Sequence, residues 1–137
     1  MYYLLIREMT KQNNNTHADW SYSAVLYEMN IRQLTPEGTL SAAEKKLDFL
    51  HSMGIDAIWM MPIYPIGEEN RKGSLGSYYS IQDYCAVNPE FGTMEDFVRL
   101  CETAHTLGLK VLIDVVYHHT SPDSVLVKSH PEYFYRK

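Results

Sequence analysis

The chain has 137 residues, 45% of them apolar, with a net charge of −5 and an isoelectric point near 5.6. This length and apolar content allow one domain with a hydrophobic core, while the acidic balance argues against nucleic acid or an anionic membrane as a main partner. No stretch approaches the roughly 20 apolar residues of a membrane span, and the opening apolar run is too short for a signal peptide, so we expect a cytoplasmic protein.

The first part of the chain gives mixed signals. A polar run at residues 11–16 would end any strand or helix that begins in the apolar residues before it. Residues 1–23 are therefore predicted to be an N-terminal extension. The first strand is predicted at residues 25–29, where the sequence reads Val-Leu-Tyr-Glu-Met.

A helix and a second strand are predicted next. Ser41 and Glu44 have the spacing of a capping box, which predicts a helix start at this point. Spacings of three and four place apolar residues on one face of this helix: Ala43, Leu47, Leu50 and Met53. Gly54 is expected to end the helix, and residues 55–61 form a buried strand that ends at Pro62.

The same order is repeated after a long loop, predicted at residues 63–92. Thr93 and Asp96 give a second helix-start signal. An apolar stripe then runs along the predicted helix: Phe97, Leu100, Cys101, Ala104 and Leu107. Gly108 ends this helix, and a third strand is predicted at residues 109–116, where nearly every side chain is apolar.

Alternating strands and helices of this kind predict an α/β fold with parallel strands and right-handed crossovers. Strands that are apolar on both faces belong to a sheet covered on both sides. Trp59 in the second strand is expected to pack in the core, although a tryptophan near a cleft can also contact sugar. The sequence has no Gly-rich phosphate-binding turn, which disfavours a nucleotide-binding sheet. The pattern alone leaves a doubly wound sheet and a barrel about equally well supported.

Polar side chains gather at the end of the third predicted strand. Asp114 is predicted inside this strand, and Tyr117, His118 and His119 follow it. In α/β folds the chemistry is placed at the carboxyl ends of the strands. A carboxylate in so apolar a strand needs a cationic or hydrogen-bonding partner, because burying it alone is very costly.

The segment Asp114-Val-Val-Tyr-His118-His119 resembles the first signature region of the α-amylase family of glycoside hydrolases, Asp-Val-Val-x-Asn-His. Three further stretches resemble the same family: Met53–Pro62, Gly76–Tyr84 and Asn88–Thr93. The resemblance covers residues 24–137 in unbroken order. It implies the first part of a (β/α)8 catalytic barrel, with about three parallel strands and two helices, ending where the loop or inserted domain after strand three begins.

The resemblance implies a glycoside hydrolase that cleaves α-glucosidic bonds in starch-like glucans or maltooligosaccharides. Members of the family retain the anomeric configuration by using two carboxylates about 5 Å apart. These carboxylates belong to later strands, so the nucleophile and the acid/base are expected beyond Lys137, and no catalytic residue is assigned within the chain. The chain is expected to be inactive without the remainder of its barrel. Two alternatives stay open: a transglycosylase or α-glucosidase of the same family, and a non-catalytic relative or sugar-binding fragment.

The resemblance also implies site residues. Tyr79 matches the aromatic residue that stacks on a sugar ring, with Tyr78 as its substitute, and His119 matches the histidine that hydrogen-bonds sugar hydroxyls. Asp114 matches the aspartate that supports a catalytic arginine and aspartate from later strands. Many relatives use the asparagine at the position of His118 to bind structural calcium, but calcium prefers oxygen ligands. A calcium site in the full-length protein stays open, but the imidazole of His118 argues against it, and no metal ligand is assigned.

Overall fold

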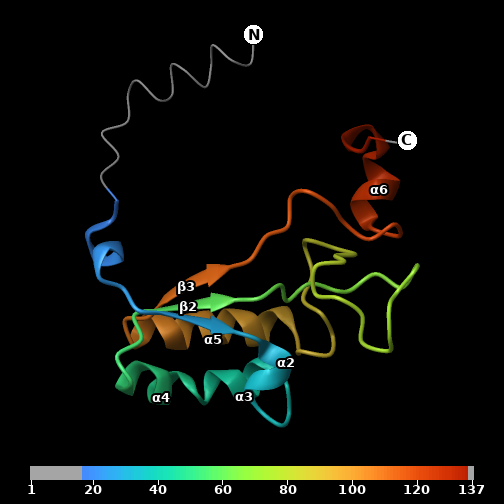
Figure 1. Cartoon of the computed structure of the whole chain (residues 1–137). Coiled ribbons are helices and arrows are strands. Elements are labelled where there is room, and N and C mark those ends of the chain that lie inside the picture. Colours follow the sequence, from blue (N-terminus) through green and yellow to red (C-terminus); the bar gives the residue numbers. More distant parts are fainter. Residues whose placement is uncertain (1–16, 136–137) are drawn as a thin grey trace, which may run out of the picture.

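The computed structural model describes residues 17–135, and these form a three-stranded parallel sheet with helices on one side (Figure 1). The strands are β1 (Leu26–Met29), β2 (Ala57–Met60) and β3 (Lys110–Ile113), and they lie side by side in chain order. Both strand pairs are parallel. The prediction of an α/β fold with parallel strands is thereby confirmed. No helix within residues 17–135 is long and apolar enough to cross a membrane.

Two predictions concern the ends of the chain. The N-terminal extension predicted at residues 1–23 lies outside the described residues up to position 16. Lys137, beyond which the nucleophile and the acid/base are expected, also lies outside them. The position of the catalytic carboxylates therefore stays a prediction.

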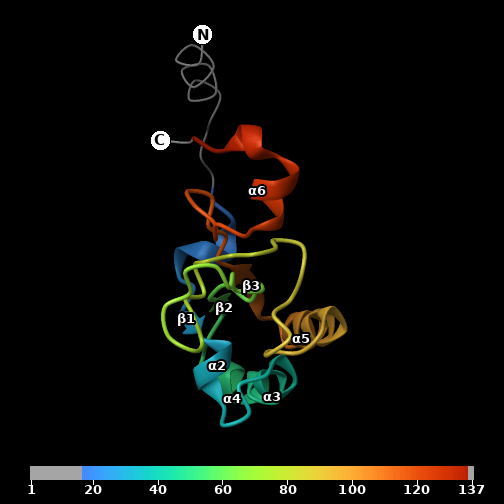
Figure 2. The same ribbon diagram turned by 90° about the vertical axis from the view of Figure 1, so that its right-hand side faces the viewer.

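The crossovers between the strands are helical. Three short helices connect β1 to β2, and one longer helix connects β2 to β3: α2 (Ile31–Leu34), α3 (Leu40–Glu44), α4 (Leu47–Ser52) and α5 (Met94–Thr106). In both ribbon views α3, α4 and α5 lie on the same side of the sheet (Figures 1 and 2). A 3-10 turn, η1 (Asp19–Tyr22), precedes β1, while α6 (Val125–Ser129) and a second 3-10 turn, η2 (Pro131–Tyr133), follow β3.

The hydrophobic core lies between the sheet and these helices. Because side chains alternate along a strand, one set faces the helices, and its central members Met29, Ile58 and Met60 are fully buried. Leu40 and Leu47 from α3 and α4, and Leu100 and Ala104 from α5, complete the core from the other side.

The opposite face of the sheet is not covered by any element within residues 17–135 (Figure 1). Leu26, Trp59 and Leu112, which alternate with the core residues, are 54%, 41% and 39% exposed. Within residues 17–135 Trp59 does not pack in the core as expected, because it lies on the other face from Ile58 and Met60. A sheet that closes into a barrel turns this face inward.

The helix predicted to start at Ser41 begins earlier, as α3. Thr39, not Ser41, is the N-cap of α3, because its hydroxyl accepts a hydrogen bond from the N–H of Ala42 at 3.3 Å. The helix is interrupted after Glu44, and α4 starts at Leu47. Met53 lies beyond the end of α4 and is exposed, although its spacing had placed it on the buried face.

Ser41 and Glu44 instead bind side chains of the other crossover. The hydroxyl of Ser41 donates to Asp96 at 2.9 Å, and Arg99 forms ion pairs with Glu44 at 3.0 Å and with Asp96 at 2.6 Å. Thr103 donates to the second oxygen of Glu44 at 2.8 Å. The residues that suggested a local cap thus hold α3 against α5.

The second helix follows its sequence signal. Thr93 and Asp96 form the predicted capping box, in which each side chain accepts from the backbone N–H of the other residue. Cys101 on α5 is partly buried, and this burial raises the pKa of its thiol. β3 ends at Ile113, three residues earlier than predicted, because its neighbour β2 ends at Met60 and offers no further ladder partners.

Candidate functional site

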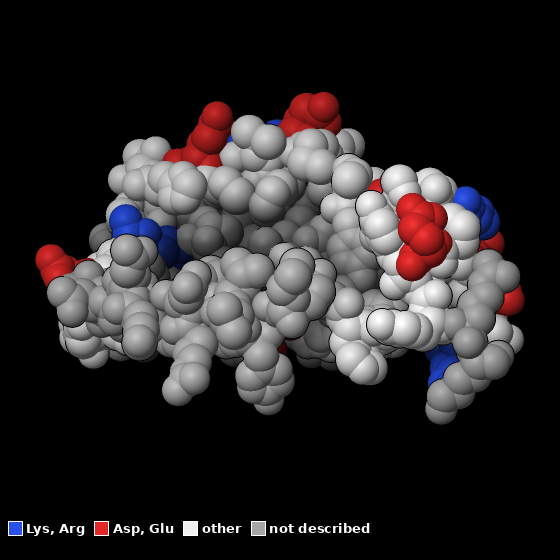
Figure 3. Space-filling view, turned by 90° about the horizontal axis from the view of Figure 1, so that it is seen from above, with Lys and Arg blue, Asp and Glu red and all other residues white. Residues whose placement is uncertain are grey.

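Two loops meet at the carboxyl ends of the parallel strands (Figure 1). One is the long loop at residues 61–93, between β2 and α5, and the other is the segment at 114–124, between β3 and α6. This edge is where α/β sheets place their binding sites. In the view from above, both positive and negative side chains are visible (Figure 3).

Asp114 is the first residue after β3, rather than a residue inside the strand. Its N–H still donates to the carbonyl of Met60 at 2.9 Å, which fixes the backbone at the strand end. The hydroxyl of Tyr79 donates to Oδ2 of Asp114 at 3.1 Å. The half-buried carboxylate thus has the hydrogen-bonding partner that its apolar surroundings require, from within the described chain.

The phenol of Tyr79 is held in its neutral form. Partial burial raises its pKa most, and the hydrogen bond to Asp114 and the negative charge of Glu28 raise it further. A neutral phenol can keep donating to the carboxylate throughout the physiological pH range.

The long loop pairs with itself next to Tyr79, and this pairing positions the residue. Ile66 and Ile81 form an isolated antiparallel bridge. On either side of it the N–H of Gly67 donates to Ser80 at 2.9 Å, and the N–H of Gln82 donates to Pro65 at 2.8 Å. Tyr79 precedes this paired segment directly, so its backbone is fixed by local hydrogen bonds.

Tyr78, the predicted substitute for Tyr79, points elsewhere. Its hydroxyl donates to the side chain of Asn30 at 3.1 Å, and its ring stacks on Phe91 at a centroid distance of 6.4 Å. The guanidinium of Arg32 lies over the same ring, 4.5 Å from its centroid. The structure therefore separates the two tyrosines: Tyr79 contacts Asp114 at the end of β3, and Tyr78 packs against the hydrophobic core.

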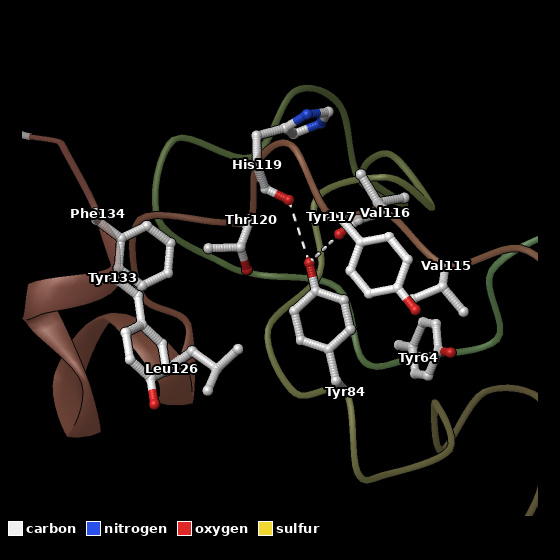
Figure 4. Close-up of a pocket in the computed structure, with 10 residues that line it drawn as sticks. All are labelled: Tyr64, Tyr84, Val115, Val116, Tyr117, His119, Thr120, Leu126, Tyr133 and Phe134. Atoms are coloured by element: carbon white, nitrogen blue, oxygen red, sulfur yellow. Dashed lines mark hydrogen bonds between the residues drawn. The ribbon is translucent and has the colours of Figure 1, made fainter. Parts of the chain in front are cut away.

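His119 lies at the rim of the site. Its backbone carbonyl accepts from the hydroxyl of Tyr84 at 3.2 Å, and the same hydroxyl donates to the carbonyl of Val116 at 2.5 Å (Figure 4). Tyr84 thereby fixes the turn that carries the two histidines. In Figure 4 the exposed imidazole of His119 points away from Tyr84, which leaves its nitrogens accessible to a ligand.

A cavity of about 360 Å³ lies next to this turn. Its walls are mostly aromatic and come from both loops and from the segment around α6: Tyr64, Tyr84, Val115, Val116, Tyr117, His119, Thr120, Leu126, Tyr133 and Phe134 (Figure 4). Burial raises the pKa of Tyr64, and its neighbours Tyr117 and Tyr84 raise it further. Cavities with aromatic walls and a few polar groups are typical of small-molecule sites.

A second cavity, of about 270 Å³, also includes His119 and is lined by Tyr79. Its other polar side chains come from the long loop: Asn70, Arg71, Lys72, Ser77 and Ser80. His119 therefore lines both cavities, one mainly aromatic and one mainly polar.

The segment after the histidines is fastened to the long loop. The carbonyl of Ile81 accepts hydrogen bonds from the hydroxyls of Thr120 and Ser121. The carboxylate of Asp123 accepts from the N–H of Glu68 at 2.9 Å, and this bond is the main reason that the pKa of Asp123 is lowered to about 2. These contacts keep the two loops that form the site in one arrangement.

The described side chains include the histidine, cysteine and carboxylate groups that commonly hold metal ions. Within residues 17–135 no three histidine, cysteine, aspartate or glutamate side chains are placed to hold one ion. His118 is exposed and contacts His119 edge to face, at a centroid distance of 5.7 Å. An imidazole in this position does not fit the oxygen coordination that calcium prefers.

Several lining residues were not singled out from the sequence. Tyr84 enters the sequence analysis only as the end of the stretch Gly76–Tyr84, and Tyr64 only as part of the predicted loop at residues 63–92. With eleven tyrosines in the chain, composition alone marks none of them. Position offers a signal in retrospect, because Tyr64 comes two residues after Pro62, which follows the second strand, at the same sheet edge as Asp114.

Comparison with known proteins agrees with the resemblance. The family model for the α-amylase catalytic domain matches residues 7–133. A crystal structure of an α-amylase from Lactobacillus plantarum is 47% identical and covers 83% of this chain with a TM-score of 0.82, and this chain matches 27% of it. A maltogenic α-amylase from Thermotoga neapolitana is 41% identical, with a TM-score of 0.78, and the match covers 83% of this chain and 28% of the amylase chain.

The curated relatives include both transferases and hydrolases. The α-1,4-glucan:maltose-1-phosphate maltosyltransferase of Salinibacter ruber is 37% identical over 127 residues, which are 79% of this chain and 19% of the relative. The trehalose-6-phosphate hydrolase of Bacillus subtilis is 36% identical over 109 residues, and the match covers 76% of this chain and 18% of the hydrolase. The chain thus spans about a fifth of the length of these relatives. Sequence, family model and fold agree, and the chain belongs to the α-amylase catalytic-domain family as the start of its (β/α)8 barrel.

Proposed function

We propose that this chain forms the first strands and part of the substrate-binding edge of an enzyme that cleaves α-glucosidic bonds in α-glucans or maltooligosaccharides with retention of configuration. The observation that carries the proposal is the contact of Tyr79 with Asp114, which places an aromatic side chain and a supported carboxylate at the strand ends beside His119. Membership of the α-amylase catalytic-domain family supports the proposed reaction class.

Each of the three residues has a distinct role in this proposal. The ring of Tyr79 covers the C–H face of one sugar unit, and the exposed imidazole of His119 hydrogen-bonds its hydroxyls. Asp114 orients groups that belong to the following strands. The nucleophile and the acid/base are two carboxylates about 5 Å apart, contributed by the strands that complete the barrel beyond Lys137.

Hydrolysis and transfer share the first half of this mechanism. A covalent glycosyl intermediate passes to water in a hydrolase and to a second sugar in a transferase. The aromatic cavity next to His119 offers a surface on which such an acceptor sugar would bind. We therefore propose hydrolysis as the main reaction and transfer to a sugar as the second candidate.

The experiment that tests the proposal is an assay of the protein expressed from its natural reading frame on maltotriose and longer maltooligosaccharides. We expect glucose-containing products with the α configuration, observed by proton NMR before mutarotation. Products longer than the substrate would identify the transferase. Sugar binding without turnover would identify a non-catalytic relative and contradict the proposed reaction.

Two variants connect the activity to this site. His119→Ala is expected to lower kcat/KM by about a hundredfold, because the hydrogen bonds of the imidazole to the sugar are lost in the transition state. His51→Ala is the matched control, since His51 is an exposed histidine on α4 that lines neither cavity. Equal activity of the two variants would contradict the role of His119.

A further inference from the structure

The polar cavity beside Tyr79 and His119 has a positive wall in a protein of net charge −5. Arg71 and Lys72 both line it, together with the amide of Asn70 and the hydroxyls of Ser77 and Ser80. No aspartate or glutamate is among its lining residues. A neutral sugar can be held by hydroxyl and amide groups alone, so the two cations call for a separate explanation.

Arg71 is fixed in place before any ligand binds. Its Nε donates to the carbonyl of Gly67 at 2.9 Å, and Nη2 donates to the carbonyl of Ile66 at 2.7 Å. The aliphatic part of the side chain lies so close to Gly76 that a Cβ on this glycine would come within 3.0 Å of it. Two of the five N–H groups of the guanidinium are used by these carbonyls, and the others remain to bind a ligand.

Within residues 17–135 neither Arg71 nor Lys72 forms an ion pair with a carboxylate, although Arg71 also lines a neighbouring cavity with Glu68 and Glu90. The ion pairs formed within residues 17–135 involve Arg32, Arg99 and His130, and neither cation of the cavity takes part in them. A preorganised arginine lowers the entropy cost of binding, and its planar fork matches the oxygens of an oxyanion. The arrangement therefore favours an anionic group over a neutral hydroxyl.

We propose that this cavity binds a phosphate group carried by the sugar that contacts Tyr79 and His119, so that the substrate class includes phosphorylated glucosides. The inference rests on the proposed function, because it needs a sugar at these two residues. Arg71 and Lys72 pair with the phosphate oxygens, and the side chains of Asn70, Ser77 and Ser80 donate hydrogen bonds to them. A volume of about 270 Å³ accommodates a phosphate group next to part of a sugar ring.

The test is a calorimetric titration of the protein, expressed from its natural reading frame, with glucose, glucose 1-phosphate, glucose 6-phosphate and inorganic phosphate. At low ionic strength we expect at least one glucose phosphate to bind about tenfold or more tightly than glucose. Lys72→Gln keeps most of the side-chain length and removes the charge. It should weaken binding of that glucose phosphate by about tenfold and leave glucose unchanged.

The control is Lys46→Gln, which removes the charge of an exposed lysine between α3 and α4, far along the chain from the cavity. It should change no affinity. Equal affinity for glucose and both phosphates, or an equal loss for all of them in Lys72→Gln, would overturn the proposal. Inorganic phosphate that binds as tightly as the sugar phosphates and is insensitive to Tyr79→Ala would also overturn it, by identifying a site for a free anion.

A titration with maltotriose separates this inference from the proposed function. If maltotriose binds and Tyr79→Ala weakens it while the phosphates show no preference, only the phosphate subsite fails. If neither maltotriose nor any glucose derivative binds, the proposed function fails and the inference fails with it. Lys72 is exposed and its replacement leaves the loop hydrogen bonds of Arg71 intact, so loss of folding does not obscure the result.

Discussion

The hydroxyl of Tyr79 lies 3.1 Å from Oδ2 of Asp114, and this contact joins the long loop to the end of β3. The two residues are 35 positions apart in sequence, so the bond depends on the completed fold. Tyr79 has two roles that substitution can separate: its hydroxyl supports the carboxylate, and its ring is proposed to cover a sugar face.

Tyr79→Phe removes the hydroxyl and keeps the ring. We expect it to lower the free energy of unfolding by about 1 kcal/mol, the usual net value of one hydrogen bond, and to leave maltotriose affinity within about threefold of wild type. Tyr79→Ala should weaken maltotriose binding by about tenfold, because the stacking surface is also lost. Urea unfolding and calorimetric titration measure the two effects. Equal affinity in both variants would show that the ring does not contact sugar.

The stacked group of Arg32, Tyr78 and Phe91 gives a second prediction. Arg32 also forms an ion pair with Glu90 at 2.9 Å. Arg32→Lys keeps the charge but loses the planar contact with the two rings, and we expect a loss of about 1 kcal/mol in unfolding free energy. Glu90→Gln is the control for the exposed ion pair and should cost less than about 1 kcal/mol. A larger effect of Glu90→Gln than of Arg32→Lys would contradict this account.

Stability should fall on acidification because of Asp96. The N–H of Thr93 holds the pKa of this carboxyl well below its usual range, and the hydrogen bonds from Arg99 and Ser41 lower it further. Because the folded pKa is below the unfolded value of about 3.9, the stabilisation is complete above that value and is lost as the pH falls toward the folded pKa. Asp123, with a pKa lowered to about 2, acts in the same direction.

The measurement is the urea midpoint between about pH 6 and pH 2. The wild-type midpoint should fall over the acidic part of this range, and Asp96→Asn should flatten the fall, since the amide does not titrate. The double variant Asp96→Asn, Asp123→Asn should be flatter still. Curves that remain parallel to wild type would show that neither carboxylate contributes to acid sensitivity.

The parts of the fold that local sequence determines were predicted well. The capping box of Thr93 and Asp96 needs only residues three apart, and the structure contains it. Ser41 shows the same spacing with Glu44, but Arg99 binds both side chains from 58 and 55 positions away, and the cap passes to Thr39. Long-range partners of this kind are not visible in a local pattern.

The same reasoning applies to the site. The sequence pointed to the end of the third strand because a carboxylate and histidines follow an apolar run. It favoured Tyr79 only through the family resemblance and kept Tyr78 as a substitute, since adjacent residues in a loop differ in direction through the backbone around them. The bridge between Ile66 and Ile81 closes the part of the loop that contains Arg71, Lys72 and both tyrosines, and such a long-range pairing is not visible in a local pattern.

Gly67 is predicted to be essential for docking the two loops. A Cβ at this position would overlap with Cβ of Ser121, a fully buried residue, and with Oδ1 of Asp123. Gly67→Ala should therefore cost about 1–3 kcal/mol of unfolding free energy, which urea unfolding measures. Ser121→Gly removes the nearer atom, so the double variant should lose less than the sum of the single losses. Additive losses would place the cost of Gly67→Ala elsewhere.

The uncovered face of the sheet gives the last prediction. Trp59 lies on this face with Leu26 and Leu112, and burying such a side chain removes a large apolar area from water. In the 137-residue chain expressed alone, with Trp20→Phe to leave one reporter, acrylamide should quench Trp59 readily. Fusion to the later barrel strands of a solved relative should shield Trp59 and shift its emission to the blue, because a closed barrel turns this face inward.

Trp59→Phe with Trp20 retained is the control, since Trp20 lies in η1 outside the sheet and should be quenched alike in both proteins. If Trp59 is equally accessible in both proteins, the uncovered face does not become the barrel interior.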